Sequence, residues 1–223
     1  MLFNIFERLF SKINRELFYV CNVIFYGHLG KNSFVNKPCL IKNKNCIFMG
    51  KDVFIRNYAI IEAITIYEGQ LYNPKIIIED GVSIEQSLHL TCAENIIIGK
   101  NTAIAANVTI SDIHHTYDDI NIPIERQKLR VAPIKIGDDC KIYNNAVILQ
   151  GISIGKHVTV AANSVVTKDI PDYCVVAGIP ARIIKRYSFE TKEWEIIPHP
   201  INQFDYIVFC FDFFCVIIQD GTK

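Results

Sequence analysis

The chain has 223 residues and balances 23 basic against 23 acidic side chains, so its formal net charge is zero. This balance argues against a nucleic-acid-binding protein and against a basic membrane-surface protein, both of which need a positively charged footprint. Half of the residues are hydrophobic and 21% are charged, a composition that excludes a disordered chain and supplies enough apolar material for a packed core.

Residues 1–28 form the predicted N-terminal cap. Apolar residues recur there at spacings of three and four, at Leu2, Phe6, Leu9, Phe10, Ile13 and Leu17. This spacing predicts an amphipathic helix that covers the end of the core. Charged residues interrupt the apolar ones throughout, unlike in a signal peptide or a transmembrane segment, so we expect the mature protein to be the whole chain.

A six-residue period dominates residues 29–171. An aliphatic residue opens each hexad, at Leu29, Val35, Ile41, Met49, Ile55, Ile61, Ile78, Ile84, Leu90, Ile98, Ile104, Ile110, Ile136, Ile142, Ile148, Ile154, Val160 and Val166. The period slips only after three hexads, so extra residues enter at one corner of an 18-residue turn. A chain that turns every six residues and closes every eighteen predicts an all-β, three-sided solenoid of about six coils, and the strict phase disfavours a β-sandwich.

The longest insertion, residues 111–135, begins with the sequence SDIHHTYDD. Long loops in compact repeats are commonly functional, and this one holds His114 and His115. An imidazole can take a proton from an alcohol near neutral pH, so either histidine is a candidate general base. Adjacent histidines on a loop are more often plain surface residues, and the spacing alone leaves both interpretations open.

A metal site is the alternative use of the histidines. Convergence of His89, His114, His115 and His157 would be required, because zinc needs three or four ligands. The sequence contains no pair of histidines three or four residues apart, so we expect no metal site.

Residues 172–195 form the predicted C-terminal extension, in which Ala181 to Arg186 is expected to be a short basic helix. The remaining tail, residues 196–223, is mostly apolar and too short to span a bilayer, and we predict a strand or a subunit contact there. The eight cysteines lie far apart without a Cys-x-x-Cys pair, which favours reduced thiols in a cytoplasmic protein.

Two stretches near the end of the repeat, VVTKDIP (165–171) and AGIPARIIK (177–185), carry a family resemblance together with the loop sequence. Over about residues 29–195 the chain resembles the hexapeptide-repeat O-acetyltransferases, left-handed parallel β-helix enzymes that include galactoside, maltose and polysaccharide acetyltransferases. The resemblance implies a homotrimer that takes acetyl-CoA in the grooves between neighbouring prisms and acetylates a free, nucleotide-linked or lipid-linked saccharide of surface polysaccharide synthesis, without a metal.

The resemblance also implies individual roles. The catalytic histidine of the family aligns with His115, and His114 is the reserve candidate. The implied acetyl-CoA contacts are Asn144, Ala162, Thr167, Lys168, Arg182 and Lys185. At the height of the amide with which some relatives hold the sugar, the chain has Glu85 and Gln86, and these two residues with Asp112 are the candidate acceptor contacts.

Three other functions remain open from the sequence. The enzyme could acetylate the nitrogen of an amino sugar, the solenoid could be a non-catalytic trimeric scaffold, or the protein could be a metal-dependent hydratase or lyase. Acetylation of acceptors with free and blocked amines, stabilisation by acetyl-CoA and metal analysis distinguish these functions.

Overall fold

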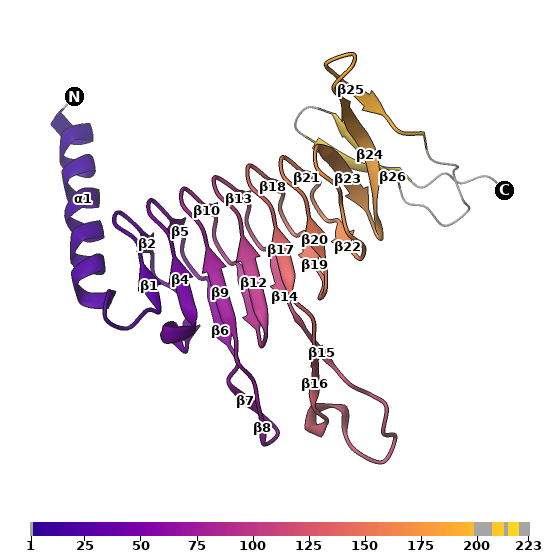
Figure 1. Cartoon of the computed structure of the whole chain (residues 1–223). Coiled ribbons are helices and arrows are strands. Elements are labelled where there is room, and N and C mark those ends of the chain that lie inside the picture. The colour runs from indigo at the N-terminus through magenta and orange to yellow at the C-terminus, as the bar shows by residue number, and fades with distance from the viewer. Residues whose placement is uncertain (1, 199–206, 212–213, 219–223) are drawn as a thin grey trace.

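The computed structural model describes residues 2–198, 207–211 and 214–218. Short strands wind into a prism with three sheets, one on each face, and their order in each sheet follows the coils along the prism axis (Figure 1). This arrangement of parallel strands confirms the three-sided solenoid that the repeat predicts, and it fits the left-handed β-helix that the resemblance implies.

Each face of the prism receives one strand from every coil. Sheet A contains β1 (His28–Leu29), β4 (Ile47–Met49), β9 (Lys75–Ile78), β12 (Asn95–Ile98), β17 (Ile134–Ile136) and β20 (Ser153–Ile154). Sheet B begins with β2 (Phe34–Val35), β5 (Phe54–Ile55), β10 (Ser83–Ile84), β13 (Ala103–Ile104), β18 (Lys141–Ile142) and β21 (Thr159–Val160). Sheet C contains β3 (Leu40–Lys42), β6 (Ile60–Ala63), β11 (His89–Cys92), β14 (Thr109–Ser111), β19 (Val147–Ile148) and β22 (Val165–Val166).

The hexad-opening aliphatic residues fill the prism. All of them except the half-buried Ile41 are buried, and equivalent residues stack in register, as in the ladder Ile84, Ile104, Ile142 and Val160. Parallel pairing places identical positions of successive coils above one another, so the six-residue period directly produces a continuous apolar core.

Left-handed backbone conformations make the corners tight. Four asparagines at the corners have a positive φ, which is 56° at Asn101, 60° at Asn107, 61° at Asn145 and 59° at Asn163. Asparagine tolerates this region better than most residues, and its amide can bond the next coil, as Asn145 Nδ2 does to Asn163 Oδ1 at 2.9 Å. The corner residues therefore connect neighbouring coils as well as turning the chain.

Helix α1 (Leu2–Asn22) stands at the N-terminal end of the prism (Figure 1). Phe18 packs edge-on against Phe34, with ring centroids 5.2 Å apart, and Arg15 lies over Phe54. Ile13 and Leu17, two members of the predicted apolar stripe, are 48% and 57% exposed. From Lys12 onward, the helix thus contacts the first coils through a face other than the one that the apolar spacing predicts, and the side chains of Leu2, Phe6, Leu9 and Phe10 lie outside the described part of the chain.

The predicted basic helix over Ala181 to Arg186 is wrong. These residues belong to strand β24 (Ala181–Ser188), which pairs antiparallel with β23 (Cys174–Gly178) and β25 (Glu193–Ile196) in an extension of sheet B. Strand β23 continues the sheet past the last coil and leaves an edge of unpaired backbone groups. Pairing with β24 satisfies that edge, and the β-branched Ile183 and Ile184 suit a strand.

Smaller elements complete the described part of the chain. Three antiparallel hairpins are formed by β7 (Ile66–Tyr67) with β8 (Gln70–Leu71), β15 (Ile113–His115) with β16 (Leu129–Val131), and β26 (Ile207–Phe211) with β27 (Phe214–Ile218). Short 3-10 turns occur at η1 (Lys44–Cys46) and η2 (Ile124–Arg126). The third hairpin shows that part of the apolar tail forms strands, as the sequence predicts. Residues 199–206, 212–213 and 219–223 of that tail lie outside the described residues.

Candidate active site

Two insertions leave the prism at the same edge, between sheets C and A. Hairpin β7–β8 follows β6 and precedes β9, and the long loop with β15 and β16 follows β14 and precedes β17. Both project from one side of the prism (Figure 1). The sequence locates both insertions through the steps from 61 to 78 and from 110 to 136, but only the second contains histidines that indicate a candidate site.

The two candidate histidines occupy neighbouring positions of β15. His114 is paired with Arg130 and His115 with Leu129 across the β15–β16 ladder. Successive side chains of a strand point to opposite faces, and the ring contacts agree: His114 lies edge-on to Tyr117, whereas His115 lies edge-on to Tyr67. The two histidines therefore face different surroundings and are not interchangeable.

His115 has two polar neighbours that the sequence did not reveal. Its Nδ1 lies 3.4 Å from Tyr67 Oη and 4.0 Å from Glu125 Oε2, and its side chain is 34% exposed. Tyr67 comes from hairpin β7–β8, and Glu125 comes from turn η2 of the long loop. Sequence separation conceals this cluster, because Tyr67 and His115 are 48 positions apart in the chain.

Asp112 is not available to an acceptor, contrary to the prediction. Its side chain is completely buried, and its carboxylate accepts hydrogen bonds from the backbone N–H groups of Ala93, Glu94 and Asn95 at 2.7 to 2.9 Å. The Cys92 thiol lies 3.2 Å from Asp112 Oδ2. Burial is the main cause that raises the pKa of this thiol, and the nearby carboxylate raises it further. Asp112 thus fixes the chain turn after β11 against the start of the long loop.

The other predicted contacts divide between two edges of sheet C. Glu85, Gln86, Asn144 and Ala162 lie at the corner between sheets B and C, and Glu85 is paired with Arg56 at 3.0 Å. Thr167 and Lys168 lie after β22, at the edge from which the His115 loop leaves. Arg182 and Lys185 lie on β24. One chain therefore does not bring all of these residues to a single point.

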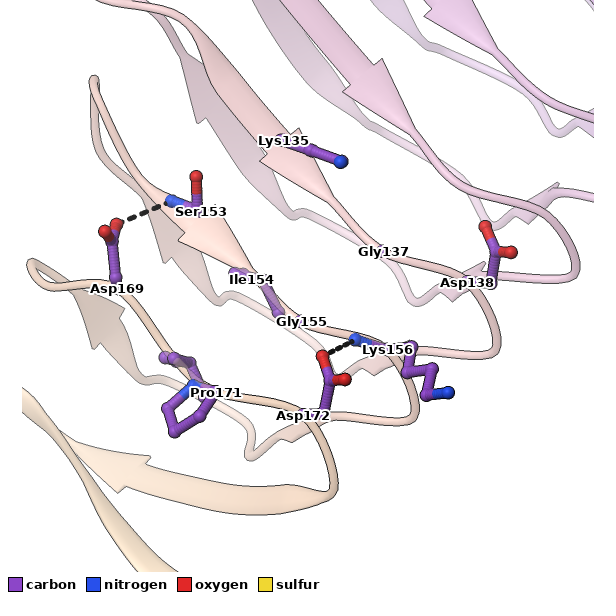
Figure 2. A pocket seen from close by; sticks show the side chains of 11 residues that line it. Lys135, Gly137, Asp138, Ser153, Ile154, Gly155, Lys156, Asp169, Pro171 and Asp172 are labelled. Atoms are coloured by element: carbon purple, nitrogen blue, oxygen red, sulfur yellow. Dashed lines mark hydrogen bonds between the residues drawn. The ribbon is translucent and has the colours of Figure 1, made fainter.

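A cavity of about 610 Å³ lies on sheet A beside the last coils (Figure 2). Lys135, Ser153 and Lys156 line it together with three carboxylates, of which that of Asp138 accepts a hydrogen bond from the Lys100 N–H at 2.9 Å. Asp169 accepts a hydrogen bond from the Ser153 N–H at 2.7 Å, and Asp172 accepts one from the Lys156 N–H at 2.9 Å. All three carboxylates are thus engaged with the backbone of the preceding coil, and the Lys156 ammonium lies over the ring of Tyr173.

The described part of the chain contains neither a metal-binding cluster nor a membrane-spanning helix. Within residues 2–198, 207–211 and 214–218, no group of three or more His, Cys, Asp or Glu side chains is arranged to hold a metal ion. Over the same residues, no helix combines the length and the apolar character that crossing a membrane requires.

The chain is similar to known proteins that contain the hexapeptide repeat. The profile of the family described as bacterial transferase hexapeptide (six repeats) matches residues 133–168. WbbJ of Escherichia coli K12, provisionally named a lipopolysaccharide biosynthesis O-acetyl transferase, is 33% identical over 165 residues, which cover 71% of this chain and 81% of WbbJ.

Two further proteins that are similar to this chain are acetyltransferases. A 2,3,4,5-tetrahydropyridine-2,6-dicarboxylate N-acetyltransferase of Clostridium perfringens is 53% identical over 62 residues, or 28% of this chain and 26% of that enzyme. The crystal structure of the hexapeptide-repeat acetyltransferase VCA0836 of Vibrio cholerae with acetyl-CoA matches with a TM-score of 0.51 and 29% identity, over 81% of this chain and 84% of that one.

Proposed function

Because the chain belongs to the hexapeptide-repeat acetyltransferases, which use acetyl-CoA, we propose that it transfers the acetyl group to a sugar hydroxyl with His115 as the general base. The observation that carries this proposal is the position of His115. It stands on a hydrogen-bonded ladder at the root of the longest insertion, it is 34% exposed, and its Nδ1 faces two polar groups. These are the features of a base that is held in one orientation yet reachable by an acceptor.

The proposed reaction is a direct transfer between two bound substrates. Acetyl-CoA supplies an activated thioester. His115 accepts the proton of the acceptor hydroxyl at Nε2 while the hydroxyl oxygen forms a bond to the carbonyl carbon. The carbon–sulfur bond then breaks, and the His115 imidazolium returns the proton to the CoA thiolate. This sequence needs no cysteine nucleophile, and residues 111–135 contain none.

A trimer with shared sites explains the division of the candidate residues between two edges. Glu85, Asn144 and Ala162 lie at one edge of sheet C, whereas His115 and Lys168 lie at the other. If neighbouring prisms pack edge to edge around a threefold axis, one edge of each chain meets the other edge of the next. Each site would then combine the His115 loop of one chain with the corner residues of its neighbour.

Exposed cations of the last coils suit the phosphates of acetyl-CoA. Lys168, Arg182 and Lys185 are all exposed and come from the end of the prism and from β24. Ammonium and guanidinium groups are the usual partners of phosphate in proteins. We therefore assign these three residues to the pantetheine-phosphate and nucleotide end of acetyl-CoA, with Asn144, Ala162 and Thr167 along its length.

Replacing Lys168 with alanine should raise the Michaelis constant for acetyl-CoA about fivefold and leave kcat and the Michaelis constant for the sugar unchanged, since one charge-assisted contact is lost. Initial rates at varied acetyl-CoA concentration measure this effect. Lys31→Ala removes another exposed lysine, from the first coil, and serves as the control. A Lys168 variant in which only the constant for the sugar changes would place acetyl-CoA elsewhere.

Release of free CoA in the presence of sugars tests the proposed function. The assay should use chromatography, because exposed cysteines such as Cys21 and Cys39 would react with a thiol dye. We expect release that depends on an acceptor and a product whose acetyl group is removed by mild alkali, as an ester is. Absence of release, together with no rise in melting temperature at saturating acetyl-CoA, would favour a non-catalytic scaffold.

N-acetylation is the second candidate, favoured by the likeness to the Clostridium N-acetyltransferase over 62 residues. Amino sugars with a free and with a blocked amine distinguish the two reactions, since only the free amine yields an alkali-stable amide. The name of WbbJ favours surface polysaccharide as the destination of the product, and the reduced cysteines that we expect favour the cytoplasm as the compartment.

A further inference from the structure

Hairpin β7–β8 is joined to the long loop by two tyrosines. Tyr72, directly after the hairpin, accepts a hydrogen bond from the Leu129 N–H at 2.9 Å, and its hydroxyl lies 3.3 Å from the Leu129 carbonyl oxygen. Leu129 is the residue paired with His115 in the β15–β16 ladder. Tyr72 therefore supports the backbone behind His115 without contacting the imidazole.

Tyr67 contacts the imidazole itself. Its hydroxyl oxygen lies 2.6 Å from the Glu125 carbonyl oxygen, 3.0 Å from Glu125 Oε2 and 3.4 Å from His115 Nδ1. The rings of Tyr67 and His115 are edge-on, with centroids 5.5 Å apart and an interplanar angle of 75°. The Tyr67 hydroxyl thus contacts both the Glu125 carboxylate and the His115 imidazole.

The donors and acceptors of this cluster determine the direction of the hydrogen bonds that Tyr67 forms with Glu125 and His115. A tyrosine hydroxyl has one hydrogen to donate, and both Glu125 oxygens only accept, so the hydrogen points to Glu125. Desolvation is the main cause that raises the pKa of Tyr67, and the hydrogen bond to Glu125 raises it further. The Tyr67 hydroxyl therefore keeps its hydrogen near neutral pH. The lone pairs of the hydroxyl remain for His115, and only a protonated Nδ1 can donate to them.

We infer that Tyr67 is a positioning residue for acetyl transfer: by accepting a hydrogen bond from Nδ1–H, it holds His115 in the tautomer whose Nε2 lone pair faces the reaction. The inference rests on the proposed role of His115 as the base. Glu125 acts through Tyr67, because its Oε2 lies 4.0 Å from Nδ1, beyond hydrogen-bond distance. The contact of 3.4 Å is long, as is common before substrates bind.

The test compares Tyr67→Phe with Tyr72→Phe in the full-length protein. Each change removes one hydroxyl from the same hairpin region, but only the first removes the partner of His115. We expect Tyr67→Phe to lower kcat about 10-fold or more, with both Michaelis constants unchanged, because a fraction of His115 then carries its proton on Nε2. Equal losses in the two variants would mean that the hairpin only supports the loop, and would overturn the inference.

Nuclear magnetic resonance of protein labelled with 15N-histidine provides a readout that needs no acceptor. The His115 signals are identified by their loss in His115→Asn. We expect a protonated Nδ1 in the wild type and in Tyr72→Phe, and a mixture of tautomers in Tyr67→Phe. A protonated Nε2 in the wild type, or the same tautomer in wild type and Tyr67→Phe, would overturn the inference. Failure of the proposed function shows itself separately, as a wild type that transfers no acetyl group or a fully active His115→Ala variant.

Discussion

Replacing His115 with alanine should lower turnover by about 100-fold or more, because the acceptor hydroxyl loses the group that takes its proton. The fold should survive the change. The backbone of His115 is held by pairing with Leu129, which Tyr72 supports in turn, and the imidazole itself is partly exposed. Chromatographic measurement of CoA release at saturating acetyl-CoA and sugar gives the ratio of kcat values.

His114→Ala is the matched control for this experiment. It removes the same side chain from the adjacent position of β15, where the ring faces Tyr117 and lies on the opposite side of the strand. We expect its kcat to stay within about threefold of the wild type, as is usual for a residue outside the reaction. A large loss in His114→Ala combined with near-normal turnover in His115→Ala would transfer the role of base to His114.

Binding measurements complete the comparison of the two histidine variants. Both should bind acetyl-CoA as the wild type does and show the same melting temperature, since neither residue is assigned to acetyl-CoA. A His115 variant that no longer binds acetyl-CoA would indicate that the loop had moved, and its lost activity would then say nothing specific about proton transfer.

The sequence predicts the prism well because one six-residue period of the sequence corresponds to one side of the prism. Each aliphatic residue at a hexad start becomes a buried residue of one face, and every slip of the period becomes an excursion at one corner. The position of His115 at the root of an excursion follows from this. Its neighbours Tyr67 and Glu125 do not, since their approach depends on how two insertions lean toward each other in space.

The errors of the sequence interpretation occur where tertiary contacts decide the outcome. The stretch from Ala181 to Arg186 looks like a basic helix by itself, but the open edge of β23 makes it a strand. Asp112 lies two and three residues before the histidines, as a substrate ligand could, yet its carboxylate accepts hydrogen bonds from three backbone N–H groups of the turn between β11 and β12. Nothing in the spacing of residues indicates whether a loop carboxylate points to solvent or to a turn.

Asp112→Asn should destabilise the fold by about 3 kcal/mol or more. The buried carboxylate accepts N–H groups at both oxygens, from Ala93 at Oδ1 and from Glu94 and Asn95 at Oδ2. An asparagine has one oxygen, so its amide nitrogen must face at least one of these N–H groups. Hydrogen bonds to a charged group contribute about 1.5 to 3 kcal/mol each, and a buried donor left without a partner costs a similar amount. Urea unfolding at fixed protein concentration measures the change in the free energy of unfolding.

Asp118→Asn distinguishes this effect from a general loss of negative charge in the loop. Asp118 is 59% exposed and forms an ion pair with the exposed Arg130, a type of contact that contributes at most about 1 kcal/mol. Stability close to the wild type in both variants would mean that water or a shifted turn replaces the carboxylate. A stable Asp112→Asn protein with a raised Michaelis constant for the sugar would restore the acceptor role that burial now excludes. The expected result, a large loss of stability in Asp112→Asn alone, would make this carboxylate the anchor that holds the His115 loop to the coil beneath it.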